Sequence, residues 1–327
     1  MPHRRLPSKW LRSLAIPVLA AAFTCTASLS AQVDEHGFSA TTSSDAITLF
    51  DSGKPILRYQ ISRQDRDGKW PRTNYVHPLW SLEGNPLTED FPEDHGHHRG
   101  VFWSWHQTLV SNKPAGDAWL CNNFQWIVRG ANARISNERA QVRALVEWRS
   151  PDIIGEHGKP ISIAREDITI TAHPLHALTR SIDFDIKVNA LVPDLQIGGS
   201  DDSKGYGGFS VRMKLTEDLS FSGPNGDVQP TLNAVQTDRW MNIARAGEGI
   251  AVLAHPQNPK PRDAWILRSA RSMQNAAYPG RTPVAVSRDK PLRLRYRLVI
   301  HDGELDAQRL NSIFAEYTKS NSAPPID

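Results

Sequence analysis

The residues best suited to chemistry are three histidines within four positions, in the segment EDFPEDHGHHRGVFWSWHQ at 89–107. An extended chain places His95 and His97 on one side and His98 on the other, because side chains alternate along a strand. Two imidazoles spaced by two residues can converge on one ion, and a single imidazole transfers protons well because its pKa is about 6.5. The cluster therefore predicts either half of a site for one divalent metal ion or a metal-free acid–base site, with hydrogen-bonded scaffolding as the alternative.

A metal ion at this His-x-His pair needs further ligands from distant parts of the chain. His77 in YVHPLW and His255 in VLAHPQ are the best donors. Each ends an apolar strand beside a proline, which would stop the strand and expose its tip. The predicted metal ligands are therefore His77, His95, His97 and His255.

Charged residues on both sides of the three histidines favour acid–base catalysis if no metal binds. Asp94 precedes the histidines and Arg99 follows them, so proton donors and acceptors share one short segment. In the scaffolding alternative, Asp94 and Arg99 pair with each other. The predicted catalytic residues are Asp94, His95, His97, His98 and Arg99.

Two tryptophans follow the cluster on one face of a strand. In VFWSWH that face carries Val101, Trp103 and Trp105, and three large apolar groups on one face usually belong to a core. The competing interpretation is a sugar platform, because the flat apolar face of a pyranose stacks on indole while its hydroxyl groups find polar partners nearby. The ten tryptophans of the chain are suggestive of carbohydrate binding.

A second polar segment, DDSKGYGGFSVRMKL at 201–215, could also contact a ligand. Its consecutive glycines enter a strand and let the backbone approach a ligand closely, although a tight loop would use them equally well. Arg99 and Arg212 would orient hydroxyl or carboxylate groups. The predicted ligand-binding residues are Trp103, Trp105, Tyr206, Arg212 and Trp265.

Alternation with a period of two dominates the chain and predicts half-buried antiparallel strands. The clearest examples are QVRALVEWRS, SIDFDIKV and RLRYRLVIH. The residues predicted to face inward are Val142, Ala144, Val146, Trp148, Ile182, Phe184, Ile186, Val188, Leu294, Tyr296, Leu298 and Ile300. Turn signals such as Asp67-Gly68 and Pro279-Gly280 separate the strands. The fold class is therefore all-β, a large antiparallel β-sandwich.

Only the C-terminal segment departs from this pattern. Leu310, Ile313, Phe314 and Tyr317 recur at helical spacing, and Asp302 is placed to cap the start of a helix. We expect one C-terminal helix that packs on a sheet.

The N-terminus has the layout of a cleaved secretory signal, with basic residues, an apolar stretch and then small residues. We expect a signal peptide at 1–31, cleaved near Ala27 to Ala31, and export to the periplasm or out of the cell. Residues 32–46 are predicted to be a polar leader, and 47–327 a single β-sandwich domain.

Charge and cysteine content restrict the partners. Removal of the four basic residues of the signal lowers the formal charge from +3 to −1, and acids and bases then alternate without a basic face. This excludes a nucleic-acid partner, and no segment after the signal is long and apolar enough to span a membrane. Cys121 is the one cysteine left, so an intrachain disulfide is excluded. A small molecule or an oligosaccharide is the expected ligand, and nothing indicates an oligomeric state.

Four segments in order, YVHPLW, DFPEDHGHHRGVFWSW, YGGFSVRMKL and LAHPQNP, resemble the PmoA family, which is also catalogued as the domain of unknown function DUF6807. The resemblance covers nearly the whole chain after the signal, and His-His-Arg-Gly is its most specific part. It implies an exported β-sandwich protein, found typically in bacteria that degrade complex polysaccharides. The length favours a supersandwich like that of galactose mutarotase over a jelly roll. The family name refers to a methane oxygenase subunit, which is a membrane protein and differs from this chain.

The leading functional hypothesis is an exported carbohydrate-active enzyme of the lyase, hydrolase or epimerase type. Its site would lie at one end of the sandwich and would use the histidine cluster as metal ligands or as acid and base. The alternatives are a secreted glycan-binding module without catalysis and a metal-dependent oxygenase.

Overall fold

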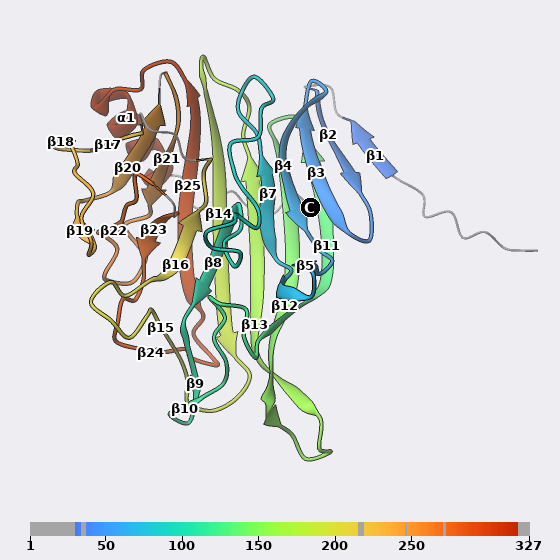
Figure 1. Cartoon of the computed structure of the whole chain (residues 1–327). Coiled ribbons are helices and arrows are strands. Elements are labelled where there is room, and N and C mark those ends of the chain that lie inside the picture. Colours follow the sequence, from blue (N-terminus) through green and yellow to red (C-terminus); the bar gives the residue numbers. More distant parts are fainter. Residues whose placement is uncertain (1–29, 34–36, 215–218, 246, 271–272, 320–327) are drawn as a thin grey trace, which may run out of the picture.

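The computed structural model describes residues 30–33, 37–214, 219–245, 247–270 and 273–319. Most of the predicted signal peptide, residues 1–29, lies outside this set. The described residues form two large antiparallel sheets that face each other, two small sheets and one helix (Figure 1). The fold is the antiparallel β-sandwich with a C-terminal helix that the alternating pattern predicts.

The larger sheet is described with ten strands, in the order β1 (Ser30–Val33), β2 (Phe38–Thr42), β3 (Ala46–Asp51), β4 (Lys54–Gln60), β7 (Tyr75–Leu79), β8 (Val101–Trp105), β16 (Gly207–Val211), β23 (Gln274–Ala277), β22 (Ala264–Ile266) and β19 (Val235–Gln236). The second is described with nine, in the order β11 (Gln125–Ser136), β12 (Arg139–Ile154), β13 (Pro160–Ala172), β14 (Thr179–Ala190), β25 (Leu292–Asp302), β21 (Glu248–Ala254), β20 (Trp240–Arg245), β17 (Ser220–Gly223) and β18 (Gly226–Asp227). The small sheets contain β10 (Lys113–Pro114), β9 (Gln107–Val110), β15 (Leu195–Gly198) and β24 (Val284–Ala285), and β5 (Gln64–Arg66) with β6 (Lys69–Arg72).

The main core lies between the two large sheets. The inward-facing residues predicted on β12, β14 and β25 are all buried there, because the period of two puts them on one side of each strand. Aromatic rings join the sheets: Trp103 contacts Phe184 with ring centroids 6.1 Å apart, and Trp105 contacts Trp148 at 5.5 Å. These contacts fix which face of β8 points inward.

The helix α1 (Ala307–Lys319) covers the outer face of the nine-stranded sheet. Its buried residues are Leu310, Ile313 and Tyr317. They pack against Trp240 and Val299. The carboxylate of Asp306 accepts a hydrogen bond from the backbone N–H of Arg309 at 2.7 Å, so Asp306 caps the helix. The prediction of Asp302 as the cap is wrong, because the helix begins later.

The segment predicted to be a polar leader instead contains β2, which pairs with β3. Phe38 and Ala40 point into the core and are buried, while Ser39 between them is half-buried. Small polar residues around these two positions therefore concealed the alternation.

The outer face of the ten-stranded sheet carries a separate apolar cluster formed by Tyr75, Phe102, Trp119 and Met273, with Tyr206 packed against it. The loop between β7 and β8 and the loop between β10 and β11 both lie over this cluster. No helix in the described part of the chain has the length and apolar content that a membrane crossing requires.

Candidate functional site

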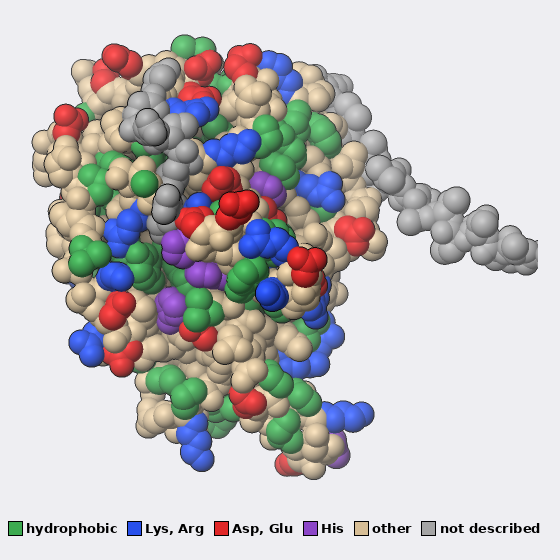
Figure 2. Space-filling model, viewed as in Figure 1, with side chains coloured by type: hydrophobic (Ala, Val, Ile, Leu, Met, Phe, Trp, Pro, Cys, Tyr) green, Lys and Arg blue, Asp and Glu red, His purple; other side chains and the backbone are tan. Residues whose placement is uncertain are grey.

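The three clustered histidines lie in the loop that enters β8. The His98 ring packs parallel to the His95 ring, with centroids 4.7 Å apart and an interplanar angle of 1°. The His97 ring meets the His98 ring edge-on at 4.5 Å, and Phe102 lies against His98 at 6.2 Å. Figure 2 shows histidine side chains gathered near the middle of one face, bordered by acidic and basic side chains. The structure thus brings the three imidazoles into mutual contact.

Arg99 holds this loop from inside the protein. Its guanidinium is fully buried, lies 3.5 Å from Asp90, and donates to the carbonyls of Gly96 at 2.9 Å and His98 at 3.0 Å, and also to that of Trp70. Gly96 packs so tightly under the Trp70 indole that a Cβ atom would lie 2.2 Å from a ring carbon. Arg99 was predicted to orient a ligand. Its hydrogen bonds instead close the turn that presents the histidines.

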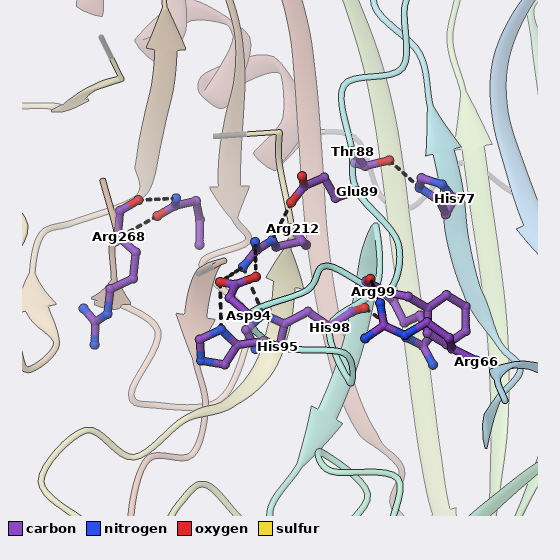
Figure 3. Close-up of polar contacts among 12 residues, drawn as sticks. Arg66, His77, Thr88, Glu89, Asp94, His95, His98, Arg99, Arg212 and Arg268 are labelled. Carbon is purple, nitrogen blue, oxygen red and sulfur yellow. Dashed lines mark hydrogen bonds and ion pairs between the residues drawn. The ribbon is translucent and has the colours of Figure 1, made fainter. Parts of the chain in front are cut away.

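Arg212, which directly follows β16, is the second arginine that holds the site (Figure 3). Its Nε donates to Glu89 at 3.0 Å, and Nη2 and Nη1 donate to the two oxygens of Asp94 at 2.8 and 3.3 Å. Nη1 also donates to Nδ1 of His98 at 3.4 Å. Only 4% of the Arg212 side chain is exposed. Arg212 was predicted to orient hydroxyl or carboxylate groups of a ligand, and in the structure its guanidinium positions Asp94 and His98.

Asp94 and His95 form a hydrogen-bonded pair. The Asp94 carboxylate lies 2.9 Å from Nδ1 of His95. Burial raises the pKa of Asp94, but hydrogen bonds from His95 and Arg212 outweigh burial and lower the pKa below its ordinary value. An ionised carboxylate accepts the Nδ1 proton, so Nε2 of His95 keeps its lone pair. The His95 side chain is 41% exposed, which leaves this ring open to a ligand.

The other two imidazoles are held neutral. Burial, followed by the charges of His95 and Arg72, lowers the pKa of His97 to about 3. Burial also lowers the pKa of His98 far below its ordinary value, and nearby His97 adds to this effect. Because Arg212 donates to Nδ1 of His98, the proton of neutral His98 resides on Nε2. The cluster therefore places Nε2 of His95, whose Nδ1 faces Asp94, beside an N–H donor on His98.

The remaining predicted metal ligands lie elsewhere. Nδ1 of His77 is 3.0 Å from the Thr88 hydroxyl, and Figure 3 shows His77 apart from His95. His255 is buried against Tyr317 of α1, on the opposite outer face of the sandwich. The described residues contain no group of three or more His, Cys, Asp and Glu side chains placed to hold a metal ion. The predicted four-histidine set is not assembled, because its members belong to different faces of the fold.

The predicted aromatic platform is also absent from this face. Trp103 and Trp105 are each 1% exposed and belong to the core between the sheets, and Trp265 is 2% exposed with its indole N–H bonded to the Thr237 carbonyl. These indoles cannot stack on a sugar. Tyr206 is the predicted ligand-binding aromatic that lies on the outer face, where it packs against Trp119 with ring centroids 5.7 Å apart.

Several residues near the site were not predicted from the sequence. Trp119 comes from an irregular loop and contacts His98 at 6.2 Å, and no local pattern marks it. Glu166 occupies an inward position of β13, where it is completely buried and receives hydrogen bonds from Trp103 and Trp148. A carboxylate at an inward position of an otherwise apolar alternation was a signal that could have revealed it.

A cleft of about 420 Å³ is lined in part by Arg72, Cys121, Phe124 and Trp126 and by none of the clustered histidines. Its volume is within the range of small-molecule sites, about 300–1,000 Å³. Arg72 stacks on the Trp126 ring at 4.1 Å and donates to the Ser104 hydroxyl on the outer face of β8 at 3.2 Å. Arg72 therefore reaches from this cleft to the outer face of β8.

Comparison with known proteins gives matches to solved structures and to one family model. A crystal structure of a "putative mutarotase" from Salmonella typhimurium is similar at 12% identity and a TM-score of 0.40, covering 84% of this chain and 97% of that chain. The comparison with curated proteins found no match. A family model described as "Family of unknown function (DUF6807)" matches residues 46–315, and this description does not carry the PmoA name. The chain belongs to the DUF6807 family.

Proposed function

We propose that this protein is an enzyme that uses His95 as a general base on a small polyhydroxylated ligand, most simply a sugar. The observation that carries the proposal is the Asp94–His95 pair, in which Asp94 takes the Nδ1 proton at 2.9 Å and leaves Nε2 open on a ring that is 41% exposed. A carboxylate that orients an imidazole in this way also stabilises the imidazolium formed when Nε2 accepts a proton.

The surroundings of this pair support acid–base catalysis over scaffolding. Arg212, which also binds Glu89, holds Asp94 and so fixes the orientation of His95 before a ligand arrives. His98 stacks on His95 and offers an N–H donor to an oxygen that gains negative charge. A structural histidine would satisfy both ring nitrogens within the protein, whereas no described partner of His95 Nε2 is found.

A sugar is proposed because hydroxyl groups match the donors and acceptors of the cluster, and because the half-buried Tyr206 ring lies on the same outer face. Tyr206 packs on the Trp119 indole, which is itself buried, and the Tyr206 hydroxyl accepts a hydrogen bond from Arg268 at 2.6 Å. The resemblance to proteins of polysaccharide-degrading bacteria agrees with this ligand class. Lyase and epimerase reactions and inverting glycoside hydrolysis all use a general base, and export to the periplasm or out of the cell remains part of the proposal.

The test compares His95→Asn with a matched control, His157→Asn. His157 is exposed in the turn between β12 and β13. Both variants and the unaltered protein are incubated with a panel of mono- and oligosaccharides. Products are followed by mass spectrometry, and anomer or epimer exchange is followed by proton NMR in deuterated water. We expect His95→Asn to lower turnover about 10²- to 10⁴-fold while the control keeps full activity.

Full activity of His95→Asn would refute the role of the base. Glycan binding by calorimetry without any product would favour the non-catalytic glycan-binding module. Circular dichroism spectra that match the unaltered protein are required of both variants, so that loss of fold is not mistaken for loss of catalysis.

A further inference from the structure

A second Asp–His pair lies on the same face as the first. His106 directly follows β8 and shares its outer face with Phe102 and Ser104. Nδ1 of His106 lies 2.9 Å from one carboxylate oxygen of Asp117. The other oxygen of Asp117 accepts a hydrogen bond from the backbone N–H of Leu120 at 2.9 Å. Asp117 is therefore fixed in its turn, and Nε2 of His106 is left free of any described partner.

The two pairs have the same connectivity. In each, an aspartate held by a separate donor accepts the Nδ1 proton and leaves Nε2 of its histidine available: Arg212 holds Asp94, and the Leu120 N–H holds Asp117. The His106 side chain is 20% exposed, so its ring is accessible, though less than that of His95. Both histidines are partly exposed, so neither ring is enclosed by the core.

The two pairs are linked through one buried ring, the Trp119 indole, which is 2% exposed. His106 stacks on the Trp119 indole with ring centroids 5.3 Å apart, and His98 meets the same indole edge-on at 6.2 Å. His97 contacts His95 with centroids at 5.8 Å.

We infer that His106, oriented by Asp117, is the second catalytic acid–base residue of the site and acts opposite His95. This inference rests on the proposed function and adds the partner that the reaction needs. Cleavage of a C–O bond requires both removal of a proton from the attacking oxygen and delivery of a proton to the departing oxygen. Two separate imidazoles, each stabilised as imidazolium by its own aspartate, meet this need.

Written for the hydrolysis of a glycoside, the step balances with water as co-reactant. Nε2 of neutral His95 takes a proton from water, whose oxygen forms a bond to the anomeric carbon. The glycosidic C–O bond breaks, and Nε2 of protonated His106 gives its proton to the departing oxygen. No electrons are transferred to or from the protein, and one proton must return from His95 to His106 through solvent before the next turnover.

The test measures kcat/KM for His95→Asn, His106→Asn, the double variant and the His157→Asn control, on the sugar that the unaltered protein converts fastest. We expect each single change at the site to lower kcat/KM about 10²- to 10⁴-fold, and the double variant to be little worse than the more damaged single variant, because residues that act as one unit are not additive. Free imidazole should restore part of the activity of a His106→Gly variant, which a structural role would not allow.

Asp117→Asn provides a second variant in case His106 variants fail to fold. An amide keeps a hydrogen bond to His106 but cannot stabilise the imidazolium, so we expect a similar loss of kcat with little change in KM. If His95→Asn is inactive and the His106 and Asp117 variants match the control, the inference is overturned and the proposed function stands. If the His95 and His106 variants match the control, or if the unaltered protein converts no sugar, the inference and the proposed function are overturned together.

Discussion

Replacement of Glu166 by Gln should change the pH dependence of stability by a predictable amount. Glu166 is completely buried between the sheets, where Trp148 donates at 2.6 Å, Asn74 donates at 3.2 Å and Trp103 donates as well. Burial raises its pKa from 4.5 to about 7, and these three donors oppose that rise. The folded protein therefore binds a proton at this carboxyl more tightly than the unfolded chain does.

The direction and size of the change in unfolding free energy follow from proton linkage. The stability that Glu166 contributes is fully present below pH 4.5 and is lost as the pH rises toward its folded pKa of about 7. Each pKa unit corresponds to about 1.4 kcal/mol, so the loss is about 3 kcal/mol. Gln does not titrate. The difference in free energy of unfolding between the unaltered protein and Glu166→Gln should therefore fall by about 3 kcal/mol between about pH 4 and pH 8.

Urea unfolding followed by tryptophan fluorescence measures this difference, because the indoles of Trp103 and Trp148 are buried against the carboxyl. Glu147→Gln is the matched control. Hydrogen bonds from Arg129 and Ser162 lower the pKa of Glu147. The difference in free energy of unfolding between the unaltered protein and Glu147→Gln should therefore shrink as the pH falls. A Glu166→Gln difference that stays flat or grows with pH would refute the reasoning, since it would mean that the three donors hold the carboxylate ionised.

Three further changes test the supports of the site and the helix. Arg212→Met leaves two partly buried carboxylates without their cation and should cost about 2–4 kcal/mol of unfolding free energy, measured by urea unfolding; a cost near zero would contradict the role given to this guanidinium. Gly96→Ala forces a Cβ atom against the Trp70 ring and should cost about 1–3 kcal/mol in the same assay, and a neutral result would show that the ring moves freely. Asp306→Ala removes the helix cap and should cost about 1 kcal/mol by thermal unfolding, whereas Asp302→Ala should cost less; equal costs would argue against the cap.

Period and composition predicted the strands and the helix because these patterns are local. On β14 every second residue from Ile182 is buried, as the alternation requires. The helix likewise follows the recurrence of Leu310, Ile313 and Tyr317. Phe38 in β2 was overlooked because the residues around it are small and polar, so local composition outweighed a short alternation.

The site was predicted only in part. The sequence located the loop with His95, His97 and His98, because they are neighbours along the chain. It placed Trp103 correctly on one face of a strand but left open which face is the core, and packing against Phe184 of the opposite sheet decides this. His255 was assigned to the cluster on local grounds, although the fold places it under α1.

By itself the sequence determined the alternating strands, the terminal helix and a histidine loop beside aromatic residues, because each depends on residues within one element. Tertiary structure alone decided which side chains meet. Arg212 and Asp94 are 118 residues apart, and His106 and Asp117 pair across the β9–β10 hairpin. Spacing along the chain does not encode such contacts. They depend on the order of the strands within a sheet and on which face of each sheet packs against the core.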